Sequence, residues 1–273
     1  MGTVRNSQAT IESLERRPGV QPALGILPIS SFPVANDGDD LILLITSALS
    51  ASHLSLQDGD VLVVAQKIVS LCEGRLVRLD EIDVSTAAEA LARETGKDPR
   101  LVELIVREAS EIIRKKPGVM IVRHRLGFVG ANAGIDQSNI DHANGECALL
   151  LPVDPDMSAR KLKAALQVAT GSNVGVVISD SMNRPWRLGT VGTAIGSAGI
   201  DVLDDRRGQP DIFGRELKVT MTNRADAIAA AAVLVMGETT ERIPAAIVRG
   251  LPVENSAQMA RDCIRPLDED LFL

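Results

Sequence analysis

Several short, uninterrupted apolar runs, each bounded by polar or turn residues, constrain the fold of this chain more than any other feature. Residues 61–64 (VLVV) follow an Asp/Gly turn, residues 174–178 (VGVVI) precede a Ser-Asp-Ser triplet, and residues 245–248 (AAIV) follow a proline. Runs of this length predict strands that are covered on both faces. Helical segments separate the runs, so we expect an α/β (α+β) fold with mixed sheets.

The remaining segments predict the helices and loops of one large domain. Helical spacing of apolar residues predicts helices over 85–95, 98–115 and 225–235, and a closing helix over 253–264. A helix beginning at Leu41 is preceded by an acidic turn that suits its N-terminus. A strand within 24–33, a hairpin of 119–122 with 127–130, and a helix opened by 154–156 complete the expectation. No linker divides residues 23–273, whereas residues 1–22 form a polar arm that is either disordered or part of an oligomer contact.

Charge and composition exclude several classes of function. The chain has 36 acidic and 29 basic residues, a net charge of −7, so it lacks the positive surface that binds a phosphate backbone. Only five aromatic side chains are present, Trp186 and four Phe, so base-stacking platforms are scarce. The three cysteines form no CxxC pair and are expected to be free thiols. No apolar run suits a signal peptide or a membrane span, so we expect a soluble, cytoplasmic protein.

The chain lacks the common phosphate-loop, nucleophile-elbow and zinc-protease motifs, and its three histidines lack metal-ligand spacing. Oxygen-bearing side chains in small-residue loops remain. Asp136 follows a Gly/Ala-rich stretch, and Asp180 follows a strand; together they are candidate ligands for Mg²⁺ or Mn²⁺, although a lone Asp at a strand end is usually a cap. Ser181 and Glu238 are candidate ligands for a second ion, and two hard cations suit a triphosphate substrate.

Two further features admit a functional and a structural interpretation. Arg184 and Arg187 are suited to clamp an anionic substrate, but an exposed Arg is more often a solvated surface charge. Residues 189–199 carry glycines at 189, 192, 196 and 199, without the dinucleotide-binding pattern. This tract is equally consistent with close helix packing and with backbone approach to a ligand.

A set of motifs in fixed order resembles the coenzyme F420-0:L-glutamate ligase (F420 γ-glutamyl ligase) family. The resemblance covers residues 24–250 and rests on several strings together, namely VLVVAQKIVS with EGR, GANAGIDQSN, LLPVDPDMSA, VISDSMNRPWR, AIGSAGI, DIFGRELKVT, and ADAIAAAAVLVMGE. It implies a mixed α/β fold of two intertwined subdomains that acts as a homodimer. It further implies GTP as co-substrate, two divalent ions (Mg²⁺ or Mn²⁺) and K⁺, with glutamate added to the carboxylate of a lactyl-phosphate tail on coenzyme F420-0.

The resemblance also implies roles for individual residues. Asp136 and Asp180 would be catalytic and hold the first metal, with Ser181 and Glu238 at the second. The implied GTP contacts are Ser30, Ser31, Phe32, Pro33, Ala65, Gln66, Asn139, Met236, Gly237, Glu238, Thr239, Thr240, Glu241, Arg242 and Ile243. Small molecules are therefore the expected partners, with no role for nucleic acid or membrane.

Three positions depart from the family pattern. Leu71 stands where the family has lysine, Gln66 where serine is common, and Asn183 where glycine is common. Loss of a cation beside a triphosphate removes a contact of about 1.5–3 kcal/mol, for which Lys67 and Arg75 are candidate replacements. A ligase with another acceptor, or a nucleotide- and metal-binding protein without ligase activity, is therefore an alternative; a purely structural or partner-binding module is the third.

Overall fold

The computed structural model describes residues 23–142, 145–252 and 256–270. Its centre is a five-stranded sheet with the order β1-β12-β2-β8-β9. The strands are β1 (Gly25–Pro28), β2 (Val61–Ala65), β8 (Gly175–Asn183), β9 (Thr190–Ala198) and β12 (Ala245–Arg249). β2 and β8 are parallel, and the other neighbouring pairs are antiparallel. The expected mixed α/β class is confirmed, as are strands at 61–64, 174–178 and 245–248.

Helices cover both faces of this sheet, which accounts for its uninterrupted apolar runs. The covering helices are α1 (Leu41–Ala51), α2 (Gln66–Cys72), α5 (Pro155–Thr170) and α6 (Arg224–Met236). Alternate residues of β2 enter different cores: Leu62 and Val64 pack in the core with α1 and α5, whereas Val61 and Val63 pack in the core with α6. Residues 61–64 of β2 therefore all carry apolar side chains. These elements form the main lobe.

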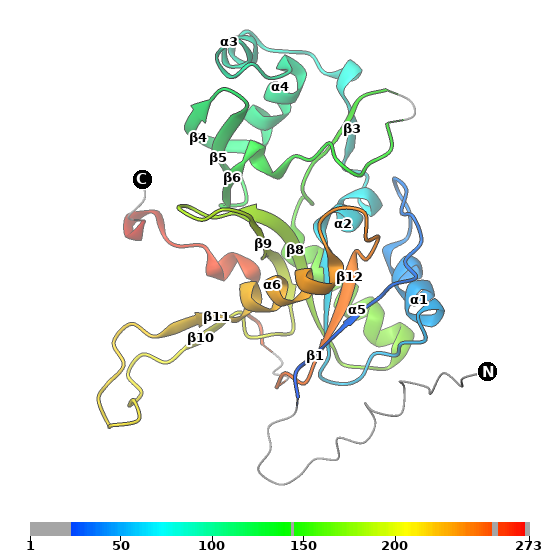
Figure 1. Cartoon of the computed structure of the whole chain (residues 1–273), viewed down its shortest axis with the longest axis vertical. Coiled ribbons are helices and arrows are strands. Elements are labelled where there is room, and N and C mark those ends of the chain that lie inside the picture. Colours follow the sequence, from blue (N-terminus) through cyan, green and yellow to red (C-terminus); the bar gives the residue numbers. More distant parts are fainter. Residues whose placement is uncertain (1–22, 143–144, 253–255, 271–273) are drawn as a thin grey trace, which may run out of the picture.

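A small lobe is inserted between α2 and α5. It contains α3 (Thr86–Thr95), α4 (Pro99–Glu108) and a sheet of β4 (Ala109–Lys116), β5 (Val119–His124) and β6 (Val129–Ala131). Figure 1 shows it above the five-stranded sheet, joined through the pair of β3 (Leu76–Arg78) and β7 (Cys147–Leu149). Its core is separate from the two cores of the main lobe. Because the chain leaves the main lobe and later returns, the expectation of two interwoven parts is confirmed.

The glycine tract at 189–199 is a strand, and its glycines allow helices to approach the sheet. A Cβ on Gly192 would overlap the carbonyl of Ala229 in α6, and a Cβ on Gly196 would overlap the carbonyl of Pro155 in α5. Of the two interpretations that the sequence allows for the tract, close helix packing applies at both positions.

Two expected helices are wrong. The helix predicted over 98–115 ends at Glu108, and residues 109–116 form β4, which pairs with β5 despite two register shifts. Pairing with a strand outside the local sequence overrides the local helical spacing. The closing helix over 253–264 is absent from the described residues 256–264, where a 3₁₀ turn (Ala260–Cys263) is found; residues 253–255 lie outside the described part, as does the predicted arm, 1–22.

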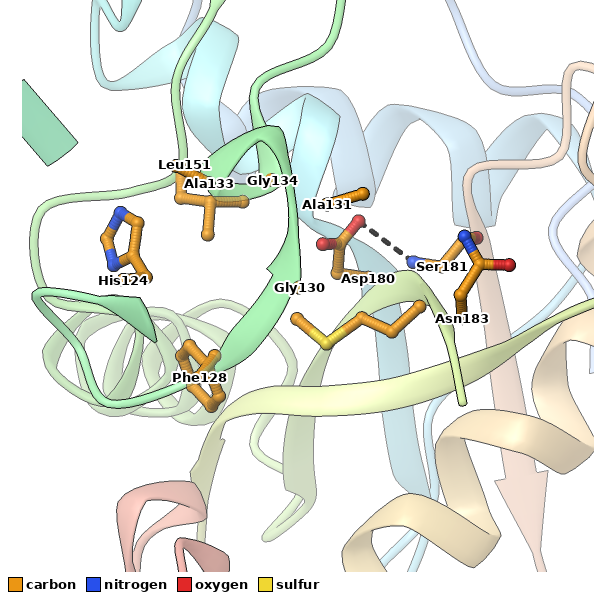
Figure 2. Close-up of a pocket in the computed structure, with 11 residues that line it drawn as sticks. His124, Phe128, Gly130, Ala131, Ala133, Gly134, Leu151, Asp180, Ser181 and Asn183 are labelled. Carbon is orange, nitrogen blue, oxygen red and sulfur yellow. Dashed lines mark hydrogen bonds between the residues drawn. The ribbon is translucent and has the colours of Figure 1, made fainter. Parts of the chain in front are cut away.

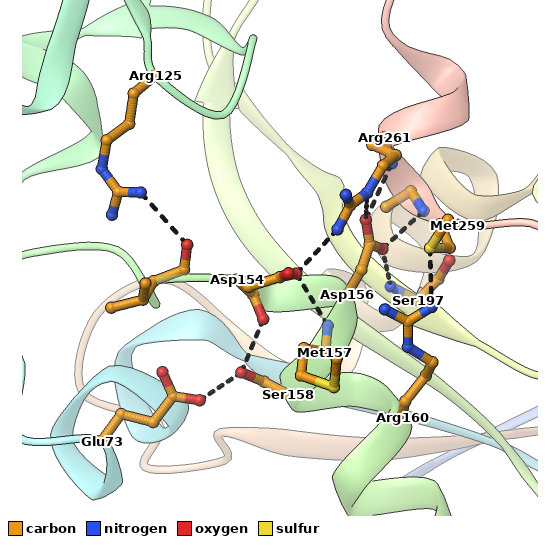
Figure 3. A network of polar contacts seen from close by, with 12 residues as sticks. Glu73, Arg125, Asp154, Asp156, Met157, Ser158, Arg160, Ser197, Met259 and Arg261 are labelled. Atoms are coloured by element: carbon orange, nitrogen blue, oxygen red, sulfur yellow. Dashed lines mark hydrogen bonds and ion pairs between the residues drawn. The ribbon is translucent and has the colours of Figure 1, made fainter.

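The buried carboxylate of Asp156 fixes this terminal segment to the main lobe (Figure 3). It accepts hydrogen bonds from the backbone N–H of Ser197 (3.0 Å) and of Ala260 (2.8 Å). It also pairs with the guanidinium of Arg261 at 2.8 Å, while Asp154 pairs with the same guanidinium at 2.9 Å. One carboxylate therefore joins α5, β9 and the 3₁₀ turn.

A two-stranded arm of β10 (Leu203–Asp205) and β11 (Met221–Asn223) extends away from the main lobe (Figure 1). Between these strands, Ile212 is 91% and Phe213 88% exposed. The three cysteines are free, as expected. Within the described ranges, no helix combines the length and apolar character needed to cross a membrane.

Candidate active site

One edge of the five-stranded sheet brings together segments that are far apart in sequence. Because β2 and β8 are parallel, Ala65 at the end of β2 lies opposite Ser179, next to Asp180. The N–H of Ala65 donates to the carbonyl of Pro244 at 2.8 Å, which places the segment before β12 at the same edge. β1 is antiparallel to β12, so the loop after Pro28 also emerges there. Segments 30–33, 65–66, 180–181 and 236–243, all predicted for the site, therefore share one edge.

Asp136 reaches this edge from the inserted chain and is held by Lys67 of α2. The two side chains form an ion pair with an Nζ–Oδ2 distance of 2.7 Å. The other carboxylate oxygen accepts hydrogen bonds from the N–H and hydroxyl of Ser138, both at 2.7 Å. Burial tends to raise the pKa of Asp136, but the bonds from Lys67 and Ser138 outweigh it and lower the pKa. Asp136 is therefore ionised, and Lys67 and Ser138 hold its carboxylate in place.

Asp180 lies within β8, which continues to Asn183 rather than ending before the Ser-Asp-Ser triplet. One carboxylate oxygen accepts a hydrogen bond from the N–H of Ser181 at 2.8 Å. Burial, together with the negative charges of Asp136 and Glu238, raises the pKa of Asp180 to about 6. The negative charges of Asp136 and Glu238 therefore act on Asp180, and a cation bound near them would relieve this repulsion.

Ser181 and Glu238, the residues predicted for a second ion, are in direct contact. The Ser181 hydroxyl donates to a carboxylate oxygen of Glu238 at 2.8 Å. Glu238 stands just after Gly237, which ends α6 as the sequence predicts. The two residues come from different elements, β8 and the loop after α6, and only the fold brings them together.

The donor set suits a hard divalent cation. Carboxylate and hydroxyl oxygens are the groups that Mg²⁺ and Mn²⁺ favour. Within the described residues, no group of three or more His, Cys, Asp and Glu side chains is arranged to hold an ion by itself. An ion here would therefore bind through one or two carboxylates and complete its shell with substrate and water oxygens, as is usual for Mg²⁺ at phosphate sites.

A hydrogen bond across the site connects Asn139 to the segment 236–243. Its side-chain amide donates to the carbonyl of Thr239 at 3.2 Å, and the carboxylate of Glu241 accepts the N–H of Thr239 at 2.8 Å. Both loops contain non-glycine residues with positive φ, Asn139 at 53° and Arg242 at 55°. Such conformations are rare and concentrate at functional sites, and no sequence signal reveals them here.

Three predicted contact residues are partly or wholly occupied in packing, and a fourth is exposed. Gln66 is buried at the start of helix α2, and its side-chain oxygen accepts a hydrogen bond from the Ser70 hydroxyl at 2.9 Å. Met236 is buried at the end of α6, and Phe32 packs against the core. Ser31 is exposed, and its N–H donates to the Ser52 hydroxyl at 3.1 Å. Contact with a nucleotide through Met236 would therefore use its backbone.

The structure distinguishes the two candidate replacements for the cation missing at Leu71. Leu71 is buried in α2. Arg75 forms an ion pair with Glu108 at 3.1 Å and donates to the carbonyl of Leu151 at 2.9 Å. Of these two cations, Lys67 therefore lies beside the carboxylates of the site, whereas Arg75 joins α2 to the small lobe. Arg184 and Arg187 are exposed on the turn between β8 and β9.

A cavity of about 60 Å³ beside Asp180 was not foreseen from the sequence. Figure 2 shows His124, Phe128 and Leu151 on one side of it and Asp180, Ser181 and Asn183 on the other. Backbone of the segment 130–134 lines the cavity between them. The cavity thus lies between β8 of the main lobe and the β5–β6 region of the small lobe.

Comparison with known proteins agrees with this arrangement. The family model for F420-0:Gamma-glutamyl ligase matches residues 30–250. A protein of Methanopyrus kandleri named coenzyme F420:L-glutamate ligase is 46% identical over 93% of this chain and 99% of its own length. Proteins of the same name from Methanothermobacter thermautotrophicus and Archaeoglobus fulgidus are 45% and 40% identical, covering 91% and 90% of this chain and 98% and 95% of their own lengths.

Proposed function

Because the chain belongs to the F420-0:gamma-glutamyl ligase family, and is therefore a ligase, we propose that it adds L-glutamate to the carboxylate of coenzyme F420-0 using GTP and divalent metal. The observation that carries this proposal is that the charges of Asp136 and Glu238 act on Asp180 at one sheet edge, where Lys67 pairs with Asp136. A cluster of carboxylates with one ammonium group suits a site for metal-bound phosphates.

A carboxylate does not react with an amine unaided, because its oxygen is a poor leaving group. In the proposed reaction, a carboxylate oxygen of the acceptor attacks the γ-phosphorus of GTP, and the bond to the bridging oxygen of GDP breaks. The glutamate amine then attacks the acyl carbon, the C–O bond to phosphate breaks, and the amine loses a proton as the amide forms. Bound divalent cations would stabilise the negative charge that develops during phosphoryl transfer.

The chain's own residues arrange the site for these two reaction steps. Asp136 and Asp180 would hold the first cation, and Ser181 with Glu238 the second. Lys67 neutralises Asp136 and places a positive charge near the phosphates. The hydrogen bond from the Asn139 side chain to the Thr239 carbonyl holds the loop at 236–243, where the remaining nucleotide contacts are expected. K⁺ would act as an additional cation at the phosphates.

A homodimer and a cytoplasmic location complete the proposal. The exposed apolar side chains of Ile212 and Phe213, at the end of an extended arm, support association with a second copy of the chain. Size measurement of the wild type and of a Phe213→Ser variant tests this association, which the substitution is expected to weaken.

Incubation with GTP, Mn²⁺, L-glutamate and coenzyme F420-0, followed by mass spectrometry, tests the reaction. The expected product is heavier by one or more glutamyl residues and appears together with GDP. Asp180→Ala is expected to abolish both products while the protein still folds. Binding of GTP and Mn²⁺ without any product would instead favour a nucleotide-binding protein without ligase activity, and GDP release with a different acid would favour another acceptor.

A further inference from the structure

The cavity beside Asp180 has an apolar end and a polar mouth. Phe128 and Leu151 line the apolar end, together with the ring of His124 (Figure 2). Both nitrogens of this ring are already in use: Nε2 lies 3.1 Å from a carboxylate oxygen of Glu108, and Nδ1 accepts the N–H of Leu126 at 3.0 Å. The three side chains therefore offer only carbon surface, whereas Asp180 and its neighbours offer polar groups at the mouth.

The size of the cavity limits its occupant. Its volume is about 60 Å³, well below the roughly 150 Å³ of an apolar cavity that holds benzene. A purine, a deazaflavin ring or a glutamate side chain with its hydrated carboxylate is therefore excluded, because each is too large or too polar. A group of one or two aliphatic carbons fits.

The wall formed by Gly130, Ala131, Ala133 and Gly134 packs closely against Leu151 at Gly134. Asn132 and Ala133 hold positive φ angles of 53° and 57°, and Ala133 is buried. A Cβ on Gly134 would approach the Leu151 side chain to 2.9 Å. These residues leave little freedom for the wall to retreat from a larger group.

We propose that this cavity receives the short aliphatic substituent on the carbon next to the carboxylate that is activated, and so selects acceptors by that substituent. The inference rests on the proposed function, which places the reacting carboxylate at the cations held by Asp180. A carboxylate at the polar mouth directs the substituent on its neighbouring carbon into the apolar end. The methyl group of a lactyl acceptor meets this requirement, whereas a glycolyl acceptor leaves the cavity without an aliphatic group.

Two acceptors that differ only at this carbon test the inference in the full-length protein. We expect kcat/KM for the lactyl form of coenzyme F420-0 to exceed that for its glycolyl analogue by about tenfold or more, the discrimination that one methylene gives in a fitted pocket. Equal values for the two acceptors overturn the cavity's role but leave the proposed ligase reaction intact. Absence of product with both acceptors overturns the proposed function and this inference with it.

A matched pair of glycine variants locates the selection. Gly130 lines the cavity and Gly25 lies on β1; neither has positive φ, and a Cβ on either meets no atom within 4 Å. Gly130→Ala adds a methyl group to a residue that lines the cavity and is expected to reduce the lactyl-to-glycolyl ratio to about one or below, while Gly25→Ala keeps the wild-type ratio. An unchanged ratio in a folded Gly130→Ala protein overturns the assignment.

A second variant enlarges the cavity and does not depend on the first. Phe128→Leu removes part of the apolar wall and conserves hydrophobic character, so the core remains covered. We expect it to raise kcat/KM for an acceptor with an ethyl substituent relative to the lactyl form. A relative rate for the ethyl acceptor that is no higher than in the wild type contradicts the proposal. Thermal melting of each variant establishes that the folded protein is compared.

Discussion

Replacement of Asp180 by Asn is expected to stabilise the folded protein while it abolishes ligation. Burial, assisted by the charges of Asp136 and Glu238, raises the pKa of Asp180 from 3.8 to about 6. This shift of about two pKa units corresponds to up to roughly 3 kcal/mol, at about 1.4 kcal/mol for each unit. The folded protein bears this cost whenever Asp180 is ionised without a bound cation.

The direction of the pH dependence follows from proton binding. Between pH 3.8 and about 6, the folded state keeps the Asp180 proton that the unfolded state has released. The free energy of unfolding of the wild type therefore falls as pH rises through this window. The amide introduced by Asp180→Asn carries no charge, so the stability advantage of this variant is near zero below the window and reaches its full value above it.

Urea unfolding at a series of pH values, with divalent metal removed by a chelator, measures this difference. Asp136→Asn is the matched control, because it changes the same group at the same sheet edge. The pKa of Asp136 is lowered, so its ionised form is favoured in the folded state and its loss costs stability above its ordinary pKa. Both variants should lose turnover, with opposite effects on stability. A less stable Asp180→Asn protein above pH 6 refutes the reasoning.

Three further changes test the scaffold. Gly192→Ala should lower the melting temperature, because its methyl group overlaps the backbone of α6. Asp156→Ala should cost about 1–3 kcal/mol in urea unfolding, because it leaves the backbone N–H groups of Ser197 and Ala260 without their acceptor, whereas the exposed helix cap Asp154→Ala should cost about 1 kcal/mol. Burial tends to raise the pKa of Glu108, but the His124 hydrogen bond and two arginines outweigh it and lower the pKa to about 2. The wild type should therefore lose stability as the pH falls from 4.5 to 2, and Glu108→Gln should be less stable than the wild type above this range and lack this pH dependence.

Predictions that depend on neighbouring residues alone agree with the structure. The acidic turn before α1 caps that helix, since Asp40 accepts the N–H of Ile42 and of Leu43. Asp154 caps α5 in the same way, and Gly237 ends α6. Such contacts span a few residues, so the local sequence contains both partners.

Predictions fail where a distant segment decides the conformation. Residues 109–116 have helical spacing, yet β5 provides a strand with which they pair. Likewise, the sequence does not indicate that Lys67 pairs with Asp136, or that the Ser181 hydroxyl donates directly to Glu238. Each pair joins different elements, and its geometry depends on the register of β2, β8 and the connecting loops.

The sequence by itself determined the buried strands of the central sheet, the caps of α1 and α5, and the segments that carry the oxygen-bearing side chains, because hydrophobic periodicity and capping act over short distances. Its ordered motifs also identified the family. The tertiary structure alone decided that four distant segments share one sheet edge, that the glycines of β9 admit two helices, and that a small cavity opens beside Asp180. These features arise from the strand order and from the contact between the two lobes. There, residues separated by tens of positions in the sequence pack against one another and interact electrostatically.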